Sequence, residues 1–137
     1  MDEATQELVR EWLRRAERDL RSARALAAQA DPLLDTAIYH CQQAAEKSLK
    51  GWLQAHDIPF AKTHDLVELV KLASDKDRSF DALERAAEIL TPYATAFRYP
   101  GGTFEPLPTN EEFDEALRQA ERVCAFVLER LPKEVRP

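Results

Sequence analysis

The sequence predicts an all-α fold, an up-and-down four-helix bundle with one short additional helix. Apolar residues recur every three or four positions along most of the 137 residues, which is the period of a helix with one buried face. No segment shows the alternation of apolar and polar residues that is typical of a half-buried strand. A chain of this length fits one domain, so we expect residues 1–137 to share a single core.

The first two helices are predicted over about residues 5–29 and from about Pro32 to His56. Asp31 is expected to cap the second helix, because proline at position 32 suits a first helical turn. The inward residues of the first helix are expected to be Leu8, Trp12, Ala16, Leu20, Ala23 and Ala27. Those of the second are expected to be Leu34, Ile38, Cys41, Ala45, Leu49 and Trp52.

A shorter helix and an interrupted one are predicted next. The shorter helix is expected to begin near Thr63 as its N-cap and to bury Leu66, Val67, Leu69 and Val70. The following seam comprises Phe80, Leu83, Ala87, Leu90, Ala94 and Phe97. Because Pro92 removes a backbone hydrogen bond and crowds the preceding turn, we expect a kink or a break near Thr91.

The last helix has the clearest start signal. Thr109 and Glu112 stand at the spacing of a capping box, in which each side chain accepts a hydrogen bond from the backbone of the other. The residues expected on its inward face are Phe113, Ala116, Leu117, Ala120, Cys124, Val127 and Leu131. The segment before it, PGGTFEPLP, is rich in proline and glycine and is predicted to be a loop.

Composition indicates a cytoplasmic protein. No apolar run approaches the ~18 residues of a membrane span, and the acidic N-terminus lacks the bases of a secretory signal. The two cysteines, Cys41 and Cys124, fall among apolar neighbours and are expected to be buried free thiols. The net charge of −6 argues against nonspecific coating of nucleic acid.

The first helix nevertheless carries a local excess of positive charge. Six arginines between Arg10 and Arg24 face only Glu11, Glu17 and Asp19, a balance of +3. The simpler interpretation is a solvated face with pairs from Glu11 to Arg15 and from Glu17 to Arg21. The alternative is a positive surface that contacts phosphate.

Motifs for catalysis or for cofactors are absent from the sequence. The three histidines lack the spacing of a zinc site, and no glycine-rich phosphate loop is present. We therefore predict no metal, no cofactor and no catalytic residue of these kinds.

Two groups of polar residues are candidates for ligand binding. His40, Gln43, Lys47 and Lys50 share one face of the second helix, and lysine charge with imidazole and amide hydrogen bonds suits phosphate. Arg98 and Tyr99 precede Pro100 and two glycines, where the guanidinium could bind phosphate and the ring could stack on a base. The alternatives are a solvated helix face and an ordinary helix stop.

The sequence resembles the HEPN domain (higher eukaryotes and prokaryotes nucleotide-binding). The resemblance depends on LRSARAL in the first helix, YHCQQAAEKSLKGWLQAHDIPFAKTHDLVELV from residue 39 onward, and the Arg98-Tyr99-Pro100 step. It implies a small helical bundle, a homodimer, and a minimal nucleotidyltransferase as partner in a two-gene, toxin–antitoxin type module. It also implies a nucleotide or RNA ligand.

Ribonucleases of this superfamily carry a histidine four to six residues after an arginine. If Arg98 is that arginine, Thr103, Phe104 and Glu105 occupy the histidine window, and none of them is histidine. General acid–base cleavage of RNA needs a group that titrates near neutrality. The resemblance therefore implies a noncatalytic member, and the alternative is a divergent ribonuclease that uses His40 or His64.

Overall fold

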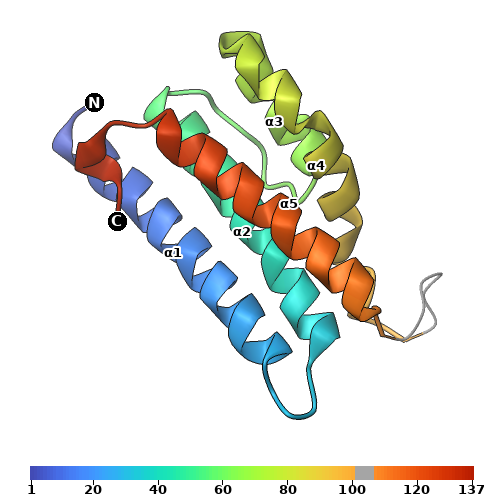
Figure 1. Ribbon diagram of the computed structural model, residues 1–137. Coiled ribbons are helices and arrows are strands. Elements are labelled where there is room, and N and C mark those ends of the chain that lie inside the picture. The colour runs from blue at the N-terminus through green and yellow to red at the C-terminus, as the bar shows by residue number, and fades with distance from the viewer. Residues whose placement is uncertain (101–106) are drawn as a thin grey trace.

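The computed structural model describes residues 1–100 and 107–137, and its elements form a helical bundle (Figure 1). Three long helices, α1 (Glu3–Ala27), α2 (Leu34–Ala55) and α5 (Asn110–Glu129), lie side by side. The shorter α3 (Leu66–Lys76) and α4 (Glu84–Leu90) cover the side of α2 that lies away from α1. The bundle also contains short 3₁₀ segments: η1 (Arg78–Leu83), η2 (Thr91–Ala94) and η3 (Lys133–Val135). The described residues contain no strand, as the sequence predicts.

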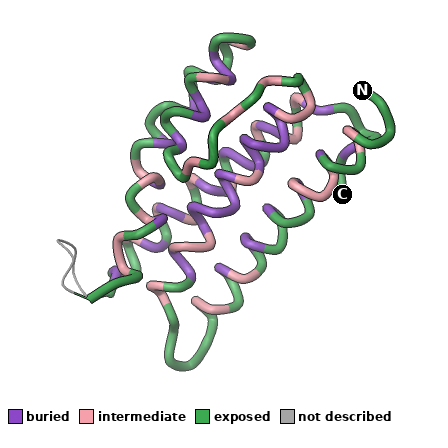
Figure 2. Tube along the Cα trace, turned by 180° about the vertical axis from the view of Figure 1, so that it is seen from behind, coloured by how far each residue is buried: buried purple, intermediate pink, exposed green. Residues whose placement is uncertain are grey.

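Helix α2 is the centre of the bundle. It packs against α1, α5, α3 and α4, and 14 of its 22 residues are buried, which Figure 2 shows as a nearly continuous purple helix. A stack of aromatic rings joins it to the other side of the core. The ring centroid of Phe80 in η1 lies 4.4 Å from that of Trp52 and 5.0 Å from that of Phe126. Aromatic pairs at such distances stabilise a core beyond the area that they bury.

Helices α1 and α2 approach each other closely at Gly51. A Cβ atom placed on this residue would lie 3.2 Å from Cβ of Trp12. A larger side chain at position 51 would therefore push the two helices apart, because the Cβ atom of Trp12 is fixed to its backbone.

Both cysteines are buried free thiols, as predicted. Cys41 is fully buried, and Cys124 accepts a hydrogen bond from the Ser48 hydroxyl, with 3.1 Å between Oγ and Sγ. Burial raises the pKa of Cys41 to about 12 and that of Cys124 to about 11. Both therefore stay protonated and unreactive in the folded protein.

The buried face of α1 differs from the prediction at its N-terminal half. Val9 and Leu13 enter the core, whereas Leu8 is 45% exposed and Trp12 lies at the edge. Both pairs of residues have helical spacing, so the periodicity alone could not choose between them. At the edge of the core, Trp12 packs against Phe60, with the two ring centroids 6.3 Å apart.

Two predicted N-caps are wrong. Asp31 does not cap α2, whose N-cap is Leu33 with no side-chain hydrogen bond. Asp65, and not Thr63, caps α3: its Oδ1 accepts from the backbone N–H of Val67 at 2.9 Å. The carboxylate stands directly before the first helical residue, while the Thr63 hydroxyl accepts from the Asp65 N–H, at 3.1 Å.

Several other residues of the predicted inward faces lie further out than expected. Val67 of α3 is 38% exposed, and four more are only partly buried: Ala27, Leu34, Phe97 and Leu117. The capping box of α5 is confirmed, because Thr109 and Glu112 exchange hydrogen bonds of 3.0 and 3.1 Å.

The predicted break near Thr91 is confirmed. Helix α4 ends at Leu90, and the chain continues as the 3₁₀ segment η2, with Pro92 in its first turn. Thr91 stabilises the junction, since its hydroxyl donates to the carbonyl of Ala87 and accepts from the N–H of Leu66, at 2.7 and 3.1 Å. The seam from Phe80 to Phe97 is therefore divided among η1, α4, η2 and a turn.

The arginines of α1 are only partly paired as predicted. Arg15 Nε donates to Glu11 Oε1 at 2.9 Å. The predicted pair of Glu17 with Arg21 is absent from the ion pairs of residues 1–100 and 107–137.

None of the helices within residues 1–100 and 107–137 is long and apolar enough to span a membrane.

Candidate functional site

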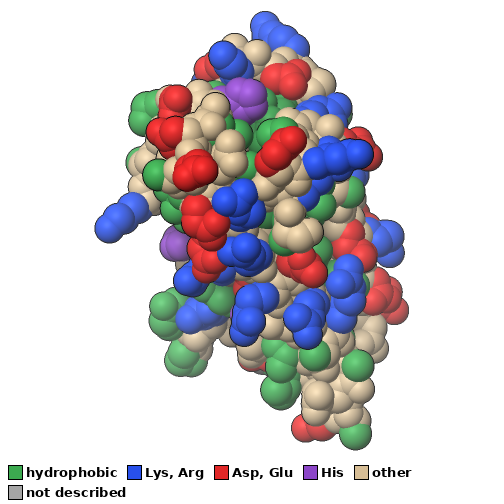
Figure 3. Space-filling model, turned by 90° about the vertical axis from the view of Figure 1, so that its left-hand side faces the viewer, with side chains coloured by type: hydrophobic (Ala, Val, Ile, Leu, Met, Phe, Trp, Pro, Cys, Tyr) green, Lys and Arg blue, Asp and Glu red, His purple; other side chains and the backbone are tan. Residues whose placement is uncertain are grey.

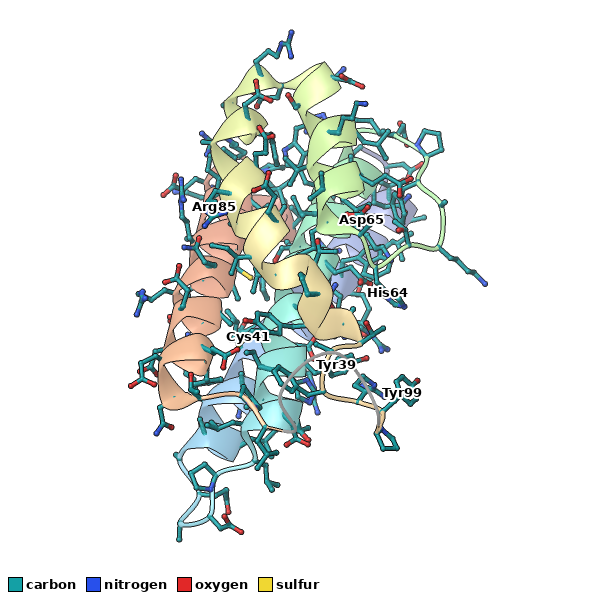
Figure 4. The ribbon with its side chains drawn as sticks, turned by 90° about the vertical axis from the view of Figure 1, so that its right-hand side faces the viewer. Tyr39, Cys41, His64, Asp65, Arg85 and Tyr99 are labelled. Atoms are coloured by element: carbon teal, nitrogen blue, oxygen red, sulfur yellow. The ribbon has the colours of Figure 1, made fainter. Side chains whose placement is uncertain are left out.

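The candidate site lies where the turn after η2 meets the N-terminal half of α2. Figure 4 shows Tyr39 of α2 beside the segment that leads to Tyr99. The guanidinium carbon of Arg98 lies 4.1 Å from the centroid of the Tyr39 ring, which is the geometry of a cation–π contact. The turn that carries Arg98 is closed by a backbone hydrogen bond from its N–H to Thr95 O, at 3.2 Å.

A hollow of about 290 Å³ adjoins this contact, lined by Asp35, Thr36, Tyr39, Phe97 and Arg98. It presents a guanidinium, an aromatic ring, a hydroxyl and a carboxylate to one space. Such a mixture suits a ligand that has both a phosphate and hydroxyl groups, because arginine binds the former and a carboxylate accepts from the latter.

A buried carboxylate from α1 continues the site along α2. Asp19, whose side chain is only 8% exposed, lies 2.7 Å from His40 Nδ1 and 2.7 Å from Lys47 Nζ. The carboxylate accepts, so Nδ1 of His40 carries a proton and Nε2 is left for other partners. The Tyr39 and His40 rings meet edge to face, with centroids 5.7 Å apart. Arg98, Tyr39, His40, Asp19 and Lys47 thus form one continuous chain of contacts.

Glu46 organises a second polar cluster further along α2. Its carboxylate lies 3.0 Å from Lys50 Nζ and 2.7 Å from His64 Nδ1, and it accepts from Gln42 Nε2 at 3.2 Å. Lys50 Nζ also lies 5.9 Å from the centroid of the Trp12 ring. The hydrogen bond from His64 to Glu46 holds the segment before α3 to the core. Lys50 is only 7% exposed and offers little surface to a ligand, whereas the His64 side chain is 66% exposed.

The structure separates the predicted binding residues into different environments. Arg98, His40 and Lys47 belong to the chain of contacts through Tyr39 and Asp19. Gln43 is buried and donates to Gln42 Oε1 at 2.7 Å, and Lys50 pairs with Glu46. Tyr99 is 68% exposed. The polar face of α2 is therefore not a solvated face, since its residues are buried or half-buried and bonded to other side chains.

Sequence reasoning missed Tyr39, Asp19, Asp35 and Thr36. Asp19 carried a signal, because it stands three residues after Ala16 and four before Ala23, on the inward face of the helix, where a carboxylate needs a partner. The contact of Tyr39 with Arg98 joins residues 59 positions apart, and no local pattern indicates it.

The window for a ribonuclease histidine, with Thr103, Phe104 and Glu105, lies outside the described residues, as do Gly101 and Gly102. Among the residues that are described, no histidine hydrogen-bonds Arg98, and no group of three or more His, Cys, Asp or Glu side chains could hold a metal ion.

Comparisons with known proteins agree with the helical fold. The family model described as HEPN domain matches residues 9–131. The chain is 32% identical in sequence to TT1696 from Thermus thermophilus, whose crystal structure is similar with a TM-score of 0.74. The match covers 90% of this chain and 98% of that one. The chain is 27% identical in sequence to ST0689, an archaeal HEPN homologue, whose crystal structure is similar with a TM-score of 0.70. The match covers 89% of this chain and 96% of that one. No protein with a curated description matches the chain.

Proposed function

The chain belongs to the HEPN domain family, and we propose that it is a noncatalytic member that binds a nucleotide at the Arg98 hollow and acts as the partner subunit of a minimal nucleotidyltransferase. The observation that carries the nucleotide proposal is the guanidinium of Arg98, held over Tyr39 at the edge of a hollow of about 290 Å³. Within the described residues, no carboxylate forms an ion pair with this guanidinium. Its donors are therefore available to phosphate.

The neighbouring groups suit the other parts of a nucleotide. Asp35 and Thr36 line the hollow and offer hydrogen bonds to ribose hydroxyls. Tyr99 is 68% exposed and presents a ring on which a base can stack. Lys47 and His40 add positive charge nearby, although Asp19 offsets part of it.

Titration calorimetry with AMP and ATP tests this proposal. We expect binding that Arg98→Ala weakens by at least about tenfold, which corresponds to about 1.4 kcal/mol for one charge-assisted contact. Arg85→Ala is the matched control, because Arg85 is an exposed arginine of α4 that pairs with Glu88. Both variants lose one positive charge, so an equal loss of affinity in both, or no binding at millimolar nucleotide, would contradict the proposal.

Membership of the family and the sequence resemblance support the proposed partnership. We expect the chain to form a homodimer and to bind a minimal nucleotidyltransferase encoded beside it. Co-expression of the two chains followed by size-exclusion chromatography checks this, and separate elution of the two proteins would argue against it.

A divergent ribonuclease is the second candidate, and one observation favours it. Asp19 lies 2.7 Å from Nδ1 of His40, which leaves Nε2 as a candidate acid or base beside Tyr39, whose ring contacts Arg98. Under our proposal, labelled single-stranded RNA stays intact in the presence of the purified protein. Cleavage that disappears in both His40→Ala and Arg98→Ala, but persists in His64→Ala, would establish the second candidate instead.

A further inference from the structure

The outer face of α1 carries a second cationic hollow, which shares no lining residue with the one at Arg98. It has a volume of about 310 Å³ and is lined by Arg18, Arg21, Ser22 and Ala25. Figure 3 shows Lys and Arg side chains gathered on the side of the molecule that α1 occupies. The feature is notable because the whole chain carries a net charge of −6.

The arginines of α1 fall into two groups. Four of them have carboxylate partners: Arg10 pairs with Glu7, Arg14 with Glu7 and Glu11, Arg15 with Glu11, and Arg24 with Glu121. Arg18 and Arg21 form no ion pair and no side-chain hydrogen bond within residues 1–100 and 107–137. These two are the ones that line the hollow.

Two carboxylates of α1 stand beside these arginines in sequence, and neither forms an ion pair with them within residues 1–100 and 107–137. Glu17 is exposed and forms no ion pair with Arg18 or Arg21. Asp19 stands between the two arginines in sequence, but its side chain is 8% exposed and is bonded to His40 and Lys47, both at 2.7 Å. The hollow therefore holds two arginines on neighbouring turns of one helix that have no ion-pair partner among the described residues.

The lining provides the donors and the space that a phosphate group needs. Each guanidinium presents five N–H donors in a planar fork that matches phosphate oxygens, and the Ser22 hydroxyl lines the same hollow as a further donor. Ala25 is small, so the end of the hollow stays open. Arg18, Ser22 and Ala25 are spaced four and three residues apart, which places them on one side of the helix.

We infer that this hollow is a phosphate-binding site, in which Arg18 and Arg21 hold a phosphate or diphosphate group and Ser22 donates to it. The inference stands apart from the proposed function, because it uses different residues on a different helix. The phosphate could belong to a small ligand or to the 5′ end of an RNA strand, and the two sources offer the same chemistry to the arginines.

Titration calorimetry of the whole chain with inorganic pyrophosphate tests the site. We expect the double variant Arg18→Gln/Arg21→Gln to bind pyrophosphate at least about tenfold more weakly than the parent. Glutamine is nearly as good a helix former as arginine, so α1 is expected to remain folded. The same comparison is repeated in the Arg98→Ala background, where the proposed nucleotide site does not contribute. The loss caused by Arg18→Gln/Arg21→Gln should be the same there, which separates the present inference from the proposed nucleotide site.

The matched control is Arg14→Gln/Arg15→Gln, which removes the same charge from the same helix but from arginines that have carboxylate partners. We expect it to weaken binding by less than about threefold. If both double variants lose affinity equally, the effect is general electrostatics and the site is overturned. It is equally overturned if the parent binds no pyrophosphate at millimolar concentration.

A second arm separates the two sources of phosphate. Short single-stranded RNA with a 5′-phosphate is compared with the same RNA ending in a 5′-hydroxyl. If the protein prefers the 5′-phosphate and Arg18→Gln/Arg21→Gln abolishes this preference, the site is assigned to RNA ends. The logarithm of the association constant for RNA should then fall by about 0.7 per unit of log salt concentration for each phosphate contact. Pyrophosphate binding without that preference assigns the site to a small ligand.

Discussion

Replacing Glu46 with alanine is expected to lower the free energy of unfolding by about 3–5 kcal/mol, because it leaves a buried cation without its partner. Lys50 is 7% exposed, and its Nζ lies 3.0 Å from the Glu46 carboxylate. The rings of Trp12 and Phe60 border the ammonium group and offer much weaker attraction than a carboxylate. His64 and Gln42 lose an acceptor in the same variant. Urea unfolding followed by circular dichroism measures the change.

Two further variants test the cause. Glu11→Ala removes an acidic residue that also pairs with arginines of α1, but its side chain is 44% exposed, so the expected loss is below about 1 kcal/mol. Glu46→Leu combined with Lys50→Met replaces the buried pair by apolar side chains and should restore most of the stability. If the double variant is as unstable as Glu46→Ala, the unpaired charge on Lys50 is not the cause.

Replacing Phe80 with alanine is expected to cost about 3–5 kcal/mol through the cavity that it creates. Phe80 is fully buried in η1, and its ring contacts those of Trp52 and Phe126. The variant therefore removes the ring that links α2 to α5 through a 3₁₀ segment. Thermal and urea unfolding measure the loss.

Phe60→Ala is the control for this aromatic truncation, because Phe60 is only partly buried at the edge of the core. We expect its loss to be clearly smaller than that of Phe80→Ala. An equal loss in the two variants would show that the stack around Phe80 has no special role in joining the helices.

Much of the fold could be predicted from the sequence, because long helices carry repeated local signals. The apolar period identified α1, α2 and α5, and the spacing of Thr109 and Glu112 located the start of α5. Pro92 similarly located the break after α4. The N-terminal face of α1 was misjudged, because Leu8 with Trp12 and Val9 with Leu13 have the same spacing and only the neighbouring helices decide between them.

The candidate site was predicted less completely, because it depends on contacts between distant residues. Arg98, His40 and Lys47 could be chosen for their chemistry, yet Tyr39 and Asp19 join them through contacts that no local pattern reveals. Lys50 illustrates the opposite difficulty. Its charge made it a binding candidate, but Glu46 holds it in a buried pair beneath the rings of Trp12 and Phe60.

The central position of α2 limits how the molecule can diversify. This helix forms the middle of the core and also carries Tyr39, His40 and Lys47. Most substitutions along it would therefore change both the stability of the bundle and its ligand preference. Arg98 and Tyr99 after η2, and Arg18 and Arg21 on the outer side of α1, are exposed and contribute little to the core. New specificities would therefore arise most readily at these two peripheral places, around an unchanged middle helix.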